Sequence, residues 1–169
     1  THPAPERTTF TGRYLRVTDL PFNPAPYQQP HPPIWVGGDS AATQHLALEV
    51  GDGWVALRGA TRDGLQQLRS SPAWPRRPFS IVRNATIFVG DSRQAALERA
   101  ELTYAGGGGG PAASLEAFLQ TAIVGTPQDC VAQLEDMHSW GVNYVRLAFH
   151  SVELQTEFAT RVLPLVTRR

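Results

Sequence analysis

From residue 34 onward, short apolar runs of strand-forming residues alternate with segments whose apolar residues recur at helical spacing. This alternation constrains the fold strongly, because a chain ordered strand, helix, strand, helix builds a parallel sheet with right-handed crossovers. We expect an α/β fold of four such units, which form either a small open sheet or half of an eight-stranded (β/α) barrel. The expected strands are residues 34–36, 54–57, 79–89 and 142–149.

Capping residues and helix breakers delimit the expected helices. Thr126, Pro127 and Asp129 supply an N-cap, a first-turn proline and an acidic residue near the third helical position, which together predict a helix start. Glycines 106–110 lack the spacing and the following lysine of a P-loop, so we interpret them as a mobile loop. The expected helices are about residues 41–49, 62–69, 92–100, 112–122, 127–140 and 154–163.

The first 33 residues read as a proline-rich lead-in segment. Six prolines between residues 21 and 33 hold this stretch extended and oppose helix formation. A short apolar alternation from Phe10 to Val17 could form a strand or a hairpin arm. We therefore expect two parts, the lead-in of residues 1–33 and an α/β unit of residues 34–169.

Composition excludes several classes of function. The 169 residues have a formal net charge of zero, so there is no basic excess to bind nucleic acid. No apolar run is long enough to cross a membrane. The lone Cys130 lies in an expected helix and is interpreted as a buried structural thiol, which fits the reducing cytoplasm. His31 and His45 belong to no ligand pattern, so no metal site is expected.

The turn after the first expected strand of the α/β unit has the properties of a ligand-binding loop. Gly37 and Gly38 permit a sharp turn and close approach to the backbone, and Asp39 and Ser40 are both good N-cap residues for the next helix. A strand that passes through glycines into a helix N-terminus offers free N–H groups and the positive end of a dipole, which suits a phosphate. A tight turn without any ligand explains the local pattern equally well.

Five segments together resemble the bacterial luciferase-like monooxygenase family, whose members are flavin- or deazaflavin-dependent oxidoreductases on a (β/α)8 barrel. The resemblance covers nearly the whole chain and implies its C-terminal half, with the fifth strand beginning at Ile34 and the eighth ending near Phe149. The segments are FTGRYLRVTDLPFNPAPYQQPHPPIWVGG (10–38), GDGW (51–54), VGTPQDCVAQL (124–134), GVNYVRLAF (141–149) and LP (163–164).

This resemblance implies that the turn after the fifth strand holds the phosphate of FMN or of the deazaflavin coenzyme F420. Backbone N–H groups and two hydroxyls one helical turn apart could converge there on one anion. The carboxylate of Asp39 would repel a phosphate, so we expect it to cap the helix instead. The implied cofactor-binding residues are Gly37, Gly38, Asp39, Ser40 and Thr43.

Four further residues are candidates for contact with the substrate or the cofactor tail, because they fall at or near the carboxyl ends of barrel strands, where such barrels keep their chemistry. Arg58 slightly favours F420, whose tail is longer and anionic. Arg146 lies mid-strand, where we expect an outer-face position or a buried ion pair. The four candidates are Trp54, Arg58, Phe149 and His150.

Two functions from different classes follow. The first is a cytoplasmic FMN- or F420-dependent oxidoreductase or monooxygenase that acts on a small organic substrate, with this chain anchoring the cofactor phosphate. Its catalytic residues are not assigned, because the resemblance places the usual acid/base candidates in strands one to four. The alternative is a non-catalytic, truncated half-barrel that forms a homodimer or pairs with a missing barrel half, because four strands cannot close a barrel.

Overall fold

The computed structural model describes residues 7–21, 26–57, 60–110 and 112–166. The chain divides into two compact units, Thr1–Pro33 and Ile34–Arg169. In the first unit, β1 (Arg7–Thr11) and β2 (Arg16–Pro21) pair antiparallel, with Phe10 opposite Val17. The apolar alternation in this segment therefore forms a hairpin.

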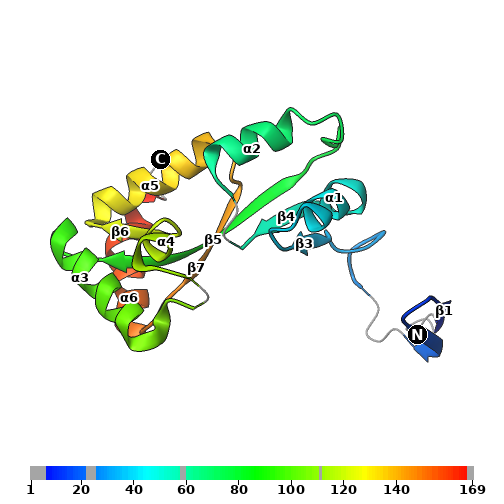
Figure 1. Cartoon of the computed structure of the whole chain (residues 1–169), viewed down its shortest axis with the longest axis horizontal. Helices are drawn as coiled ribbons and strands as arrows, with labels where there is room; N and C mark the ends of the chain where they lie inside the picture. The colour runs from blue at the N-terminus through cyan, green and yellow to red at the C-terminus, as the bar shows by residue number, and fades with distance from the viewer. Residues whose placement is uncertain (1–6, 22–25, 58–59, 111, 167–169) are drawn as a thin grey trace. The chain divides into compact units, whose positions relative to one another are not determined.

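The second unit is an α/β fold with parallel strands, as the alternation predicted (Figure 1). All four expected strands are present, within two residues of their expected ends. One further strand, β6, lies between the third and fourth of them in the chain. Within the described residues the strands of this sheet are β3 (Trp35–Gly37), β4 (Gly53–Ala56), β5 (Ser80–Val89), β6 (Ala122–Gly125) and β7 (Tyr144–Ala148).

The long strand β5 organises the sheet. Val82 and Arg83 pair with β4 and also with β7, so β4 and β7 lie on opposite edges of β5. Strand β6 pairs with the last residues of β5, Thr86–Val89, on the edge opposite β7. The four expected strands therefore lie side by side in the order β3-β4-β5-β7, as consecutive strands of a (β/α) barrel do.

Serine and threonine N-caps start every described α-helix of this unit except the last. In each case the side-chain oxygen accepts a hydrogen bond from the backbone N–H three residues later, which satisfies a donor without an intrahelical partner. These caps are Ser40, Thr61, Ser92, Ser114, Thr126 and Ser151. The helices are α1 (Ala41–Val50), α2 (Arg62–Arg69), α3 (Arg93–Thr103), α4 (Leu115–Leu119), α5 (Pro127–Ser139), α6 (Val152–Glu157) and α7 (Leu163–Val166).

Three local expectations were wrong. The expected helix 112–122 is shorter, because residues 122–125 pair with β5 as β6 and the tertiary pairing overrides the helical pattern. The glycines expected to form a mobile loop begin inside a π-helical turn, Tyr104–Gly108, that continues α3, and Gly107 supplies its kink with a φ of 86°. The helix expected at 154–163 begins two residues earlier, as α6, and continues past its expected end through a π-helical turn, Phe158–Val162, into α7, which contains Pro164.

The main hydrophobic core lies between one face of the sheet and helices that include α5. Strand β5 contributes Ile81, Ile87 and Val89, which are fully buried, and α5 contributes Cys130 and Met137. A second cluster forms around Phe88 and draws on α3, α4 and α6, which gather near the carboxyl end of β5 (Figure 1). Cys130 is buried, as expected, and burial raises the pKa of its thiol to about 11.

Arg83 of β5 is a buried cation whose side chain faces the helices that cover the sheet. It is 5% exposed, and its guanidinium donates to the carbonyl oxygen of Gln120 at 3.0 Å and lies 5.7 Å from the centre of the Trp140 ring. Burial lowers the pKa of Arg83 from its ordinary value. Its aromatic and carbonyl neighbours thus compensate part of the lost hydration.

Candidate functional site

The turn between β3 and α1 is fixed by hydrogen bonds to β4. The backbone N–H of Gly38 donates to the carbonyl oxygen of Val55 at 3.1 Å, and the Trp54 indole N–H donates to the carbonyl oxygen of Gly38 at 2.6 Å. Gly38 has a φ of 137°, which residues with a side chain rarely adopt. The second glycine of the pair therefore has a conformational role, and the turn is rigidly held.

Two hydroxyls meet at the start of α1. Ser40 is the N-cap: its Oγ accepts from the backbone N–H of Thr43 at 3.1 Å and lies 2.8 Å from the Oγ1 of Thr43. A Cβ added at Gly38 would lie 3.0 Å from the Cγ2 and 3.1 Å from the Oγ1 of Thr43, so the turn and the first helical turn are closely apposed. The structure thus brings together Gly38, Ser40 and Thr43 of the predicted set.

This arrangement has the donor chemistry of an anion site. The first N–H groups of α1 point out of the helix end, where its dipole is positive, and the first turn of α1 contains no acidic residue. Because a side chain at Gly38 would fill the space beside Thr43, the glycine keeps the backbone and the two hydroxyls open to an incoming group. The residues present therefore fit a phosphate bearing a cofactor tail.

Asp39 does not cap α1, which corrects the expectation from the sequence. Its Oδ1 accepts a hydrogen bond from the backbone N–H of Leu57 at 2.9 Å, just beyond the end of β4. Because Ser40 occupies the N-cap, Asp39 precedes the helix, and its carboxylate bonds across to the neighbouring strand end. The bond ties the turn to the loop that follows β4.

The four candidates for contact with the substrate or the cofactor tail lie in different environments. Trp54 is 2% exposed in the main core and holds the turn through its bond to Gly38. Phe149 is partly buried and packs against both core clusters, with its ring 5.6 Å from that of Phe158. Arg58 lies outside the described residues. His150 alone of this group is among the described residues that line the pocket considered next.

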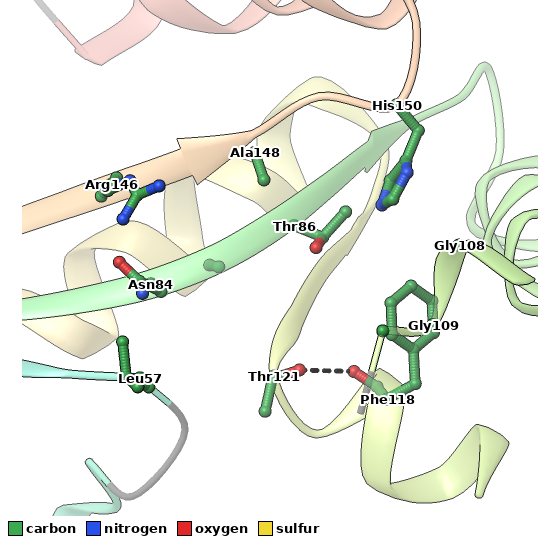
Figure 2. A pocket seen from close by; sticks show the side chains of 12 residues that line it. Leu57, Asn84, Thr86, Gly108, Gly109, Phe118, Thr121, Arg146, Ala148 and His150 are labelled. Atoms are coloured by element: carbon green, nitrogen blue, oxygen red, sulfur yellow. Dashed lines mark hydrogen bonds between the residues drawn. The ribbon is translucent and has the colours of Figure 1, made fainter. Parts of the chain in front are cut away.

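A pocket of about 330 Å³ opens at the carboxyl ends of β5 and β7 (Figure 2). Asn84 and Thr86 reach it from β5, and Arg146 and Ala148 reach it from β7. The His150 ring stacks on Phe88 at its edge, with centroids 6.1 Å apart and an interplanar angle of 7°. The remaining lining comes from Leu57, Ala85, Gly108, Gly109, Gly110, Phe118 and Thr121.

The position of Arg146 differs from the sequence-based expectation. We expected an outer-face position or a buried ion pair, but Arg146 is exposed, faces the pocket and forms no ion pair with any described residue. The period-two pattern of β7 contained the signal: Val145 and Leu147 pack into the core, so Arg146 between them must face the other way. The same alternation on β5 assigns Asn84 and Thr86 to the pocket.

Comparison with protein-family models identifies the relationship. Residues 4–144 match the model described as luciferase-like monooxygenase. The chain belongs to this family. The resemblance noted in the sequence is thereby confirmed, and so is the (β/α)8-type fold class.

Relatives of this luciferase-like chain carry the names of cofactor-dependent enzymes. It is 26% identical over 192 residues to the FMNH(2)-dependent dimethylsulfone monooxygenase of Pseudomonas putida, an alignment that covers 94% of this chain and 53% of that protein. It is 32% identical over 96 residues to the F420-dependent hydroxymycolic acid dehydrogenase of Mycobacterium tuberculosis, covering 54% of this chain and 26% of that one. The relatives thus include proteins named for either cofactor.

Solved structures share the fold. An F420-dependent secondary alcohol dehydrogenase in complex with an F420-acetone adduct aligns with a TM-score of 0.69 at 14% identity, over 97% of this luciferase-like chain and 56% of that one. The chain therefore spans about half the length of the relatives it matches. No helix of the described residues is long and apolar enough to span a bilayer, and no three of their His, Cys, Asp or Glu side chains group as a metal site.

Proposed function

We propose that this chain is the C-terminal half of a luciferase-like oxidoreductase and anchors the phosphate of FMN or F420. The observation that carries the proposal is the meeting of the Ser40 and Thr43 hydroxyls, 2.8 Å apart, at the N-terminus of α1. The family membership and the named cofactors of the relatives support the same assignment. The substrate class is a small organic molecule, and the site of action is the cytoplasm.

Each residue of the turn has a distinct part in holding the phosphate. Ser40 and Thr43 donate hydroxyl hydrogen bonds, for which they must exchange their mutual bond for the anion. The backbone N–H groups at the start of α1 lie at its positive end. The N–H of Gly38 already donates to Val55 and fixes the turn instead. Asp39 is kept turned toward Leu57, which directs its carboxylate to another donor.

When bound, the reduced flavin or deazaflavin would supply a hydride or react with oxygen, and the chain's own residues would anchor and orient it. The turn is well suited to orientation because Trp54 and Val55 of β4 fix both sides of Gly38. A rigid anchor at the phosphate restricts the ring end of the cofactor to the mouth of the barrel, where strand ends carry the chemistry in such folds.

Titration of FMN and of F420 into the purified chain, followed by cofactor fluorescence, tests the proposal. Ser40→Ala combined with Thr43→Ala should weaken binding of the phosphate-bearing cofactor by about 1–3 kcal/mol, the usual effect of removing polar partners of a charged group. Ser92→Ala is the matched control, since it removes the same kind of N-cap from α3. It should lower stability without changing cofactor affinity. Folded protein that binds neither cofactor contradicts the assignment.

The non-catalytic half-barrel is a second candidate that one observation favours. Trp35 and Tyr144 are 42% and 52% exposed, and their rings lie 5.1 Å apart on the sheet. Exposed aromatic pairs of this kind are typical of surfaces that bind another chain. In this case the chain self-associates or binds a barrel half, and neither FMN nor F420 binds to it.

A further inference from the structure

The guanidinium of Arg146 faces the pocket without a counter-ion among the described residues. None of the described residues that line the pocket is acidic, and the ion pairs of the described residues involve other cations. An arginine on the side of a strand opposite the core has a fixed backbone position, and its planar fork matches an oxyanion. The pocket therefore presents one positive charge at a defined place.

Asn84 adds a polar group beside this charge. Strands β5 and β7 align Asn84 with Arg146, and Figure 2 shows both side chains at the pocket. The Oδ1 of Asn84 is buried and has no hydrogen-bond partner among the described residues, although buried polar atoms are usually paired. Because rotation of the amide exchanges its oxygen for its NH2 group, Asn84 can give an anion a second donor beside the guanidinium.

The rest of the pocket is less polar. Leu57, Phe118 and Ala148 contribute apolar walls, and the Thr121 hydroxyl already donates to the carbonyl oxygen of Phe118 at 2.8 Å (Figure 2). A ligand that fits both the polar side at Arg146 and Asn84 and the apolar walls must combine a charged group with an apolar body. Pockets of this type use a few placed polar groups to orient a mostly apolar ligand.

We propose that this pocket selects organic anions, with Arg146 and Asn84 binding the carboxylate or sulfonate group of the substrate and the apolar walls binding its body. The inference rests on the proposed function, because a bound organic anion is a substrate only if the chain is part of the proposed oxidoreductase. Because the anion site and the cofactor-phosphate site use different residues, each can be tested without the other. Arg146 is then the residue that distinguishes anionic from neutral substrates.

Benzoate is a suitable probe, with benzyl alcohol as its uncharged counterpart of similar size. Each is titrated into the isotopically labelled chain at constant ionic strength, and the backbone amide resonances of Asn84, Arg146 and Ala148 are followed by NMR. We expect saturable shifts with benzoate and at least tenfold weaker binding of benzyl alcohol. Equal affinities for the two probes, or no shifts with benzoate in folded protein, overturn the proposal.

Two variants test the residues themselves. Arg146→Gln should weaken benzoate binding at least tenfold without changing the affinity for benzyl alcohol. Asn84→Asp keeps the shape of the side chain and places a carboxylate beside Arg146, so it should weaken benzoate binding to a similar extent. Arg76→Gln removes an exposed arginine outside the pocket lining and is the control, for which no change is expected. Benzoate affinity that survives both pocket substitutions overturns the proposal.

FMN titrations of the same proteins separate this inference from the proposed function. Arg146→Gln should leave FMN affinity unchanged, whereas the Ser40 and Thr43 double variant should bind FMN more weakly and bind benzoate as the natural chain does. Benzoate binding without FMN binding supports the anion site and contradicts the flavin proposal. Loss of FMN and benzoate together in Arg146→Gln would assign the cation to the cofactor and overturn the inference.

Discussion

Gly38 combines a backbone conformation of φ 137° with a position at which an added Cβ would lie 3.1 Å from the Thr43 hydroxyl, which we assign to the phosphate site. Gly38→Ala introduces a Cβ 3.0 Å from the Cγ2 of Thr43, in a region of φ that disfavours side chains. We expect a loss of about 1–3 kcal/mol in the free energy of unfolding, measured by urea denaturation, and weaker FMN binding.

Gly106→Ala is the matched control for this substitution. A Cβ at Gly106 meets no atom within 4 Å, and the residue lies in the π-helical turn after α3. Its stability should change by at most about 0.5 kcal/mol, because the added methyl group displaces nothing. Equal effects of the two substitutions would contradict the strained role assigned to Gly38.

Cys130 makes stability depend on pH in the alkaline range. Burial, helped by the neighbouring charge of Asp129, raises the pKa of the folded thiol to about 11. Between pH 9 and pH 11 the unfolded thiol ionises while the folded one stays neutral, so the free energy of unfolding falls as pH rises. The loss attributable to this group is roughly 2–3 kcal/mol over that window.

Cys130→Ala removes this dependence. The variant should be less stable than the natural chain at pH 7, because it leaves a cavity at a fully buried position. The difference between the two proteins, measured by urea denaturation, should shrink as pH rises from 9 to 11. A difference that stays constant would contradict the raised pKa.

At the scale of elements, the start of α5 is held by a reciprocal capping box. The Thr126 side chain accepts from the backbone N–H of Asp129, and the Asp129 carboxylate accepts from the backbone N–H of Thr126 at 3.0 Å. This backbone bond, followed by the bond from the Thr126 hydroxyl, lowers the pKa of Asp129. A carboxyl with a lowered pKa stabilises the fold above its ordinary pKa, and that stabilisation is lost as pH falls through the folded value.

Two substitutions test the capping box. Thr126→Ala should lower the free energy of unfolding by about 1 kcal/mol at pH 6, the usual effect of losing an N-cap. Asp129→Asn should be less stable than the natural chain at pH 6, and the gap should close as pH falls toward 3, because protonation removes the same interaction from the natural chain. The urea denaturation midpoints of both proteins between pH 6 and pH 3 measure this difference in stability. A difference unchanged by pH would contradict the lowered pKa assigned to Asp129.

Local signals predicted the elements with strong caps and missed those set by distant pairing. Thr126 and Pro127 mark the start of α5 in the sequence alone. For α1 the sequence offered both Asp39 and Ser40 as N-caps, and the expectation that Asp39 caps the helix was wrong. Strand β6 has four residues, too few for a clear period, and depends on β5 for its pairing. The pocket also combines residues of β5, β7 and segments outside the sheet. The exposure of Arg146 therefore indicates a pocket only once β5 and β7 are known to be neighbours.

At the scale of the whole molecule, the parallel sheet ends in strands with one partner each. Among the described residues, β3 pairs with β4 alone, and β7 and the short β6 each pair with β5 alone. The edges of β3 and β7 therefore carry backbone N–H and C=O groups without a strand beside them. Such edges favour pairing with another strand. The exposed rings of Trp35 and Tyr144 belong to these same two strands.

A second copy of this chain could cover both edges at once. A two-fold axis parallel to the strands keeps all strand directions parallel and sets β3 of each copy beside β7 of the other. The strands β3, β4, β5 and β7 of two copies then supply the eight strands that close a (β/α) barrel. Closure by the other half of a longer chain would satisfy the same edges, so the isolated 169-residue chain is the protein to measure.

We therefore expect the isolated chain to sediment at about twice its mass of 18.5 kDa at micromolar concentration and to dissociate on dilution. Trp35→Lys combined with Tyr144→Lys should give a monomer, because two added charges on the shared surface oppose its burial. Leu102→Lys, at a position 74% exposed on α3, is the control and should remain dimeric. A natural chain that stays monomeric at every concentration would show that these edges are stable in water and would remove the basis for the dimer.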